Sequence, residues 1–166
     1  MGVQTDRPTS DQLNDLLHLT TCITESLRLM PPIGQLINRL ATSSLTLGED
    51  HVVPEGTYVG YNSYATNCDP DVWGKDADEF IPGRWGETIE EVRKQYRRQK
   101  ARAELIRFHG GRRACLGEGF AMVELKVTVF MLVRWVRWSL DEEWEEKMTP
   151  AGPLAPRGLR LVFAKR

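Results

Sequence analysis

The chain has 166 residues, which is enough for one domain with a hydrophobic core. A formal net charge of −1, with 41% hydrophobic and 27% charged residues, is ordinary for a globular protein and indicates neither a nucleic-acid nor a membrane partner. The three cysteines are odd in number and far apart in the sequence, with no C-x-x-C pair, so a zinc site or a disulfide framework is not indicated and a reducing compartment fits best.

The first third of the chain predicts a helix followed by short strands. Apolar residues recur with a helical period over residues 10–30, with Ser10 as the expected N-cap and two prolines as the stop. Strands are predicted over residues 44–47, 51–53 and 57–61, because turn-forming Gly and Pro residues separate these β-prone pieces. Residues 62–86 predict irregular structure with a short helix.

The rest of the chain predicts two longer helices that flank a glycine-rich loop. A highly charged helix is expected over residues 88–104, an apolar one over residues 117–138, and a strand over residues 159–163. Four charged residues interrupt the stretch 119–138, which argues against a membrane-spanning helix. The pattern predicts an α+β fold that is mainly α, with small β-sheet pieces and no internal repeat.

The most informative residue is Cys115, because it lies in the glycine-rich stretch 108–117. Two arginines precede it and a predicted helix follows it, and such surroundings bias a cysteine toward the thiolate. Gly111 and Gly117 add no side chains, so a large flat group could approach the sulfur closely.

A second motif, Glu25-Ser26-Leu27-Arg28, lies near the end of the first predicted helix. Residues three apart share a helix face, so Glu25 and Arg28 can form an ion pair. Surface pairs of this kind are common and contribute little, but a buried pair needs further hydrogen bonds to offset desolvation.

Together, three motifs occur in the order found in the cytochromes P450. The spacing F-x-x-G-x-R-x-C-x-G at residues 108–117 resembles the haem-thiolate loop of that family, and E-x-x-R at 25–28 and P-x-R-W at 82–85 precede it. Gly83 stands where the family usually has Glu. The resemblance runs from about Asp11 to Phe163 and implies the C-terminal, proximal haem-side portion of the P450 fold, so that residues 1–166 form a partial P450 domain.

Finer features are similar to the fungal P450 group that includes the spore-wall dityrosine enzyme. These lie at residues 36–39, 59–62, 108–111 and 148–154. For that group the resemblance implies a phenolic amino-acid derivative as the substrate.

The resemblance implies a role for each matched residue. Cys115, as thiolate, would be the axial ligand of haem b and would favour O–O cleavage. Arg113 and Arg39 would pair with the haem propionates, and Phe108 would shield the sulfur. Glu25, Arg28 and Arg84 would be structural rather than catalytic. The implied cofactor-binding residues are Cys115, Arg113, Arg39, Phe108, Gly111 and Gly117.

The implied activity is a monooxygenase reaction that inserts one oxygen atom from O2 into a small organic substrate. The electron donor would be a flavoprotein of the NADPH-cytochrome P450 reductase type, docking on a basic proximal surface, and no nucleic acid is expected. That surface would be formed by residues 87–113, although a solvated helix face explains the same charges. Its cations are Arg93, Lys94, Arg97, Arg98, Lys100, Arg102, Arg107, Arg112 and Arg113.

The distal helix of the family, with its acid–alcohol pair, and the N-terminal membrane anchor are not found in this sequence. The family acts at the cytosolic face of the endoplasmic reticulum, whereas this chain is expected to be a cytoplasmic C-terminal fragment. One alternative is a truncated, non-catalytic polypeptide that retains the proximal haem-binding fold. Another is a nucleotide-binding module built on the glycine loop, which is disfavoured because no strand precedes the loop and G-K-[ST] is absent.

Overall fold

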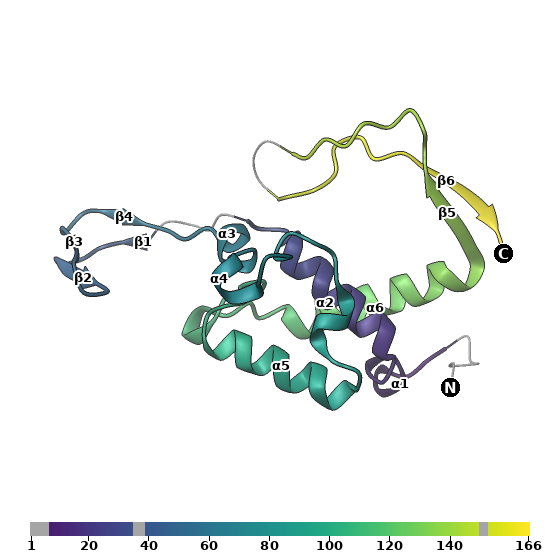
Figure 1. The fold of residues 1–166 in the computed structure, drawn as a ribbon, viewed down its shortest axis with the longest axis horizontal. Coiled ribbons are helices and arrows are strands. Elements are labelled where there is room, and N and C mark those ends of the chain that lie inside the picture. The colour runs from purple at the N-terminus through teal and green to yellow at the C-terminus, as the bar shows by residue number, and fades with distance from the viewer. Residues whose placement is uncertain (1–6, 35–38, 150–152) are drawn as a thin grey trace.

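The structure, a computed structural model, describes residues 7–34, 39–149 and 153–166. A group of helices forms the body, and two β arms extend from it toward opposite ends (Figure 1). The expected α+β, mainly α architecture is confirmed, with three separate two-stranded sheets. Parts of two segments that carry the finer fungal resemblance, residues 36–38 and 150–152, lie outside the described ranges.

The first predicted helix is divided into α1 (Ser10–Asn14) and α2 (Leu17–Leu29). The predicted N-cap is wrong by one residue, because the Thr9 side chain accepts from the backbone N–H of Gln12 and the Gln12 side chain accepts from that of Thr9. Leu16 then takes an extended conformation between the two helices. Because the helical spacing of apolar residues continues across this break, the sequence pattern predicted one helix instead of two.

The β arm that follows contains two short antiparallel pairs. β2 (Leu45–Leu47) pairs with β3 (His51–Val53), and β1 (Arg39–Leu40) pairs with β4 (Tyr58–Val59). The three predicted strands are confirmed, although β4 is shorter than expected. The pairing of β1 with β4 brings Arg39 opposite Val59, back toward the helical body.

The segment predicted as irregular forms two short helices and a 3-10 turn. These are α3 (Ser63–Asn67), α4 (Pro70–Trp73) and η1 (Pro82–Trp85). Trp73 and Trp85 lie with ring centroids 5.5 Å apart, and they form the centre of the hydrophobic core. The other buried members of that core are Ala77, Val92 and Leu105.

The charged helix is confirmed as α5 (Ile89–Ala101), which starts with a capping box between Thr88 and Glu91. It ends three residues before the predicted limit, because Ala103 adopts a positive φ of 56°. The chain then continues through a second 3-10 turn, η2 (Gly111–Arg113), to α6 (Glu118–Trp135).

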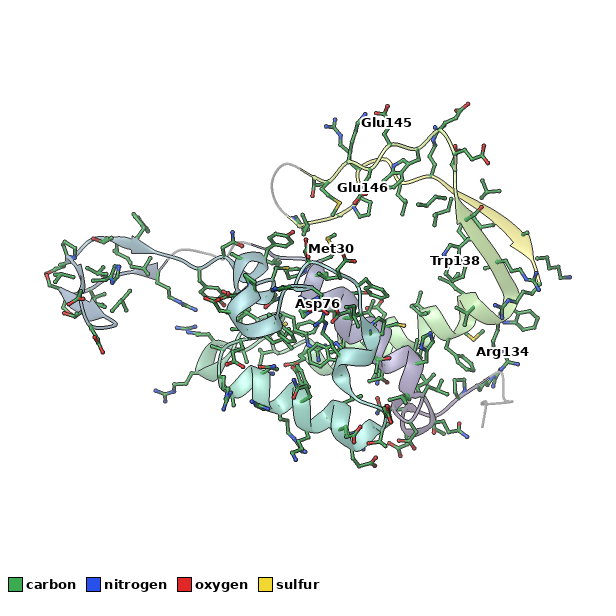
Figure 2. All side chains as sticks on the ribbon, viewed as in Figure 1. Met30, Asp76, Arg134, Trp138, Glu145 and Glu146 are labelled. Carbon is green, nitrogen blue, oxygen red and sulfur yellow. The ribbon has the colours of Figure 1, made fainter. Side chains whose placement is uncertain are left out.

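The last helix is shorter than predicted, because residues 136–138 belong to a strand. β5 (Val136–Leu140) pairs along its whole length with β6 (Leu161–Lys165), and this ladder replaces further helical turns. The predicted C-terminal strand is therefore also shifted by two residues. Trp138 is carried on this second arm, away from the helical body (Figure 2). Among the described residues, no helix combines the length and apolar character needed to cross a membrane.

Candidate functional site

The centre of the helical body is a buried ion pair between Glu25 and Arg28 on α2. Both side chains are 0% exposed. Arg28 Nε donates to Glu25 Oε2 at 3.0 Å, and Nη2 donates to Oε1 at 2.9 Å. This two-pronged geometry is the one that a guanidinium and a carboxylate form most favourably, and the i, i+3 spacing on α2 presents both groups on one face.

The remaining donors of Arg28 bind backbone carbonyls from distant parts of the chain. Nη1 donates to Asn67 O at 2.8 Å and to Ala77 O at 2.5 Å, and Nη2 donates to Glu79 O at 3.0 Å. All five guanidinium N–H groups are therefore used. Complete satisfaction of this kind allows the charge to be buried without a large desolvation penalty.

Glu25 is equally well bound by the segment around η1. Its Oε1 accepts from Arg84 Nε at 2.8 Å and from the Ile81 amide at 3.1 Å, and its Oε2 accepts from Trp85 Nε1 at 2.9 Å. Burial alone would raise the pKa of Glu25, but the hydrogen bonds from Arg28, Ile81 and Arg84 outweigh burial and hold the pKa below its ordinary value.

Arg84 closes the outer side of this arrangement. Its Nη2 donates to Asp76 O at 2.8 Å, and its Nη1 lies 3.5 Å from Asp76 Oδ1. The structure thus brings Glu25, Arg28 and Arg84 together. It also shows why Gly83 is tolerated: the Arg84 guanidinium finds its partners without a carboxylate at position 83.

Sequence reasoning missed a fourth member of this layer, Asn67 at the end of α3. It is 0% exposed, and its side-chain amide donates to Arg28 O at 3.1 Å. The same amide also binds the backbone of Ile106 through both its oxygen and its nitrogen. A lone Asn at the end of a short helix carries no periodic or spacing signal, so only the fold could identify it.

Cys115 lies in the loop between η2 and α6 and is exposed. Its backbone N–H donates to Phe108 O at 2.8 Å, which closes the loop at its base. Gly111 takes a φ of +62°, which glycine adopts without strain. A Cβ at Gly117 would lie 3.8 Å from Cys115 Sγ, so the sulfur is beside the N-cap of α6.

The loop is joined to the β1–β4 arm by a hydrogen bond of 2.7 Å between Tyr61 Oη and His109 Nδ1. His109 has a φ of 63°, an uncommon conformation for a residue with a side chain. Burial raises the pKa of Tyr61, and the positive charge of Arg39 opposes that shift. Arg39, Tyr61 and His109 therefore occupy one neighbourhood at the edge of the Cys115 loop.

A cavity of about 150 Å³ lies beside Cys115 and is lined mainly by apolar groups, including Ile33 and Phe108. Leu116 and Phe120 next to it point into open space, and Phe120 is 75% exposed. Arg113 on η2 is exposed and forms no ion pair with any described residue.

The chemistry of these groups is compatible with haem: an exposed thiol, a glycine backbone without side chains, uncovered apolar side chains, and a guanidinium with no ion-pair partner among the described residues.

The predicted basic surface is partly neutralised within the chain. Lys100 Nζ lies 2.7 Å from Glu118 Oε2, and Arg93 Nη2 lies 3.5 Å from Asp15 Oδ1. Lys94, Arg97 and Arg98 remain exposed on α5. The cationic area that is left is therefore smaller than the count of Lys and Arg residues indicated.

Comparisons with known proteins agree with this geometry. A family model described as "Cytochrome P450" matches residues 2–162. Cytochrome P450-DIT2 of Saccharomyces cerevisiae is 49% identical over 151 residues, which cover 91% of this chain and 31% of that protein. Cytochrome P450 monooxygenase xanG of Aspergillus fumigatus is 41% identical over 164 residues, which cover 99% of this chain and 30% of that protein. The chain thus spans less than a third of each of these two relatives.

Two solved structures share the fold. Retinoic acid-bound cyanobacterial CYP120A1 superposes with a TM-score of 0.83 at 24% identity, covering 99% of this chain and 36% of that one. The cytochrome P450 CYP102L1 superposes with a TM-score of 0.75 at 29% identity, covering 94% of this chain and 33% of that one.

Proposed function

Because the chain belongs to the cytochrome P450 family, we propose that its 166 residues form the C-terminal part of the family domain and carry the proximal side of a haem-thiolate monooxygenase site. The observation that carries this proposal is the exposed Cys115 sulfur, held on a closed loop between uncovered apolar side chains and an unpaired arginine. Haem b with a thiolate ligand supplies, when bound, the activation of O2 for insertion of one oxygen atom into a small organic substrate.

The residues around Cys115 would bind and orient this group. The Cys115 sulfur would hold the haem iron, and the N-terminus of α6 beside it would stabilise negative charge on the sulfur. Gly111 and Gly117 leave the approach open, and Phe108 would cover one side of the sulfur. Support for these roles comes from the positions of Phe108 and Cys115 in the wall of one cavity.

Two arginines would hold the carboxylate edge of the cofactor. Arg113 lies two residues before Cys115, and Arg39 lies on β1 near Tyr61, which is hydrogen-bonded to the same loop. A guanidinium is suited to a carboxylate because it offers parallel N–H donors. Glu25, Arg28 and Arg84 would support the loop from within the body and take no part in bond making.

The electron donor would be an acidic flavoprotein of the NADPH-cytochrome P450 reductase type. The exposed cations of α5, Lys94, Arg97 and Arg98, and those of η2, Arg112 and Arg113, would attract it. Electrostatic attraction of this kind accelerates association and is weakened by salt.

A second candidate function is a non-catalytic polypeptide that retains the proximal fold. It is favoured by the exposure of Cys115 and of apolar residues along α6, since nothing within the described chain encloses a cofactor there. A haem covered on one face only would be lost readily and would couple electron transfer poorly to oxygenation.

Haem binding can be tested with the purified chain, haem, dithionite and carbon monoxide. Wild type is expected to give the strongly red-shifted Soret band of thiolate ligation, and Cys115→Ala is expected to lose it. Cys68→Ala is the matched control and should retain the band. A wild-type complex without the shifted band would contradict axial ligation by Cys115.

Catalysis is tested separately by adding the reductase, NADPH and candidate organic substrates to the loaded chain. Product formation that depends on the reductase would overturn the non-catalytic candidate. A shifted Soret band without any product would favour it.

A further inference from the structure

Asn67 makes more directed contacts than its place at the end of a short helix requires. Its Nδ2 donates to Arg28 O at 3.1 Å and to Ile106 O at 2.9 Å, and its Oδ1 accepts from the Ile106 amide at 2.7 Å. Its own backbone carbonyl accepts from Arg28 Nη1 at 2.8 Å. Asn67 is therefore hydrogen-bonded to Arg28 of the buried ion-pair layer and to both backbone groups of Ile106, 39 positions away in the sequence.

Ile106 lies directly before the loop that carries Cys115. Ile106 is two residues before Phe108, whose carbonyl accepts the Cys115 N–H at 2.8 Å. On either side of Ile106, Leu105 is buried in the core and Arg107 stacks on Tyr96. With both backbone groups of Ile106 held by one amide, the carbonyl of Phe108 has little freedom to move.

Two other links between the body and this loop are weaker, whereas Lys100 and Tyr96 hold Glu118 on the far side of the loop, at the start of α6. Trp73 Nε1 donates to Glu104 O, but at 3.3 Å and farther from Phe108 in the sequence. The bond between Tyr61 and His109 joins side chains near the surface, where water competes for the same groups. The bond of Asn67 to Arg28 O is buried, and the two bonds to Ile106 are partly buried, with the Asn67 side 0% exposed. An unpaired polar group costs most in such an interior position.

We propose that Asn67 is a positioning residue for Cys115, which couples the Glu25–Arg28 layer to the base of the cysteine loop through Ile106 and Phe108. The coupling is a property of the polypeptide, whereas its meaning for haem ligation rests on the proposed function. In physical terms, the buried layer is rigid because it is fully hydrogen-bonded. Asn67 links the loop to that layer, and this link restricts the position of the Cys115 sulfur.

The coupling is tested on the free chain by amide hydrogen exchange at Cys115, with the amide of Val92 on α5 as an internal reference for global unfolding. In Asn67→Ala we expect Cys115 exchange to accelerate about tenfold or more relative to Val92, because the Ile106 groups lose their partners. Asn67→Asp keeps the oxygen that accepts from the Ile106 amide but replaces the N–H donors to Arg28 O and Ile106 O with an acceptor, so it should also accelerate Cys115 exchange relative to Val92.

Leu13→Ala is the matched control, because Leu13 is buried on α1 and its loss creates a cavity that destabilises the chain. In this variant the exchange rates of Cys115 and Val92 should rise by the same factor. The proposal is overturned if the Asn67 variants also accelerate both amides equally.

The effect on ligation is read from the carbon monoxide spectrum of the loaded chain. We expect Asn67→Asp to convert part of the shifted Soret band into the unshifted band at a temperature where circular dichroism shows the fold intact, and Leu13→Ala to leave the ratio unchanged. An unchanged ratio in Asn67→Asp would refute positioning of the ligand. If wild type itself gives no shifted band, the proposed function fails, and the exchange experiment still decides the coupling.

Discussion

The buried layer around Glu25 and the loop around Cys115 are built on opposite principles. In the layer, two charged side chains are 0% exposed and the guanidinium of Arg28 is saturated by carboxylate and carbonyl oxygens. In the loop, the sulfur is exposed, Arg113 has no ion-pair partner among the described residues, and Leu116 and Phe120 contact nothing that would hide them from water.

This difference separates a part whose polar groups are all satisfied within the chain from a part whose thiol and apolar side chains are exposed. A buried charge is tolerated only when its donors and acceptors all have hydrogen-bond partners. The polar groups of the layer are therefore not available to bind a substrate or cofactor. Exposed apolar side chains grouped around a ligand atom mark a surface built to be covered. Stability should therefore depend on the layer, and haem binding on the loop.

The largest effect is expected from breaking the layer with Arg28→Ala. This change leaves the Glu25 carboxylate buried without its main partner, and such losses cost about 3–5 kcal/mol. Chemical denaturation should show this loss in the free energy of unfolding, or a chain that does not fold at all.

Arg93→Ala is the control for the Arg28 variant, because Arg93 lies 3.5 Å from Asp15 in a pair whose side chains are 53% and 72% exposed. Exposed pairs contribute about 0–1 kcal/mol, so this change should be nearly silent. Comparable losses in the two variants would contradict the contrast between buried and exposed pairs.

A smaller effect is expected when acid titrates the same layer. The pKa of Glu25 is lowered in the folded chain from its ordinary value of 4.5, so its stabilising contribution is present above that pH. It is lost as the pH falls through the lowered, folded-state pKa. Urea midpoints of wild type should therefore decline below about pH 4.5 more steeply than those of Glu25→Gln, which has no carboxylate to protonate.

Equal slopes in wild type and Glu25→Gln would mean that other carboxylates carry the acid sensitivity. Glu118 is the main alternative, because hydrogen bonds from Lys100 and Tyr96 overcome the effect of burial and lower its pKa as well. Comparing the slopes of Glu25→Gln and Glu118→Gln with that of wild type shows which carboxylate causes the acid sensitivity.

The smallest change in stability is expected for Phe120→Ser on the open face of α6. Since this side chain is 75% exposed, its replacement should alter the free energy of unfolding by no more than about 0.5 kcal/mol. Haem titration should nevertheless show affinity weakened about tenfold or more, because covering a phenyl side chain contributes about 1.5–3 kcal/mol.

Phe130→Ser on the buried side of the same helix is the matched change. This variant should show a large loss in the free energy of unfolding, unlike Phe120→Ser, because it removes a core side chain and buries a hydroxyl. Unchanged haem affinity in Phe120→Ser would show that this face of α6 does not cover the cofactor.

Local patterns predicted much of the secondary structure and the ion pair between Glu25 and Arg28. The i, i+3 spacing of Glu25 and Arg28, the turns around β2 and β3, and the position of α5 are encoded within a few neighbouring residues, so they could be predicted. The break at Leu16 and the end of α6 could not, because the apolar spacing continues through both points. At the second point, pairing with β6 outweighs the local helical preference.

By itself, the sequence determined the family and the order of the motifs around Cys115, because each depends on residue types at short, fixed spacings. Only the tertiary structure decided which side chains are buried together. Asn67 and Ile106 are 39 positions apart, and Glu25 and Arg84 are 59 positions apart. Contacts across such separations have no period and no spacing rule, since they arise from packing of the core around Trp73 and Trp85. That packing buries the charged layer and leaves Cys115 exposed.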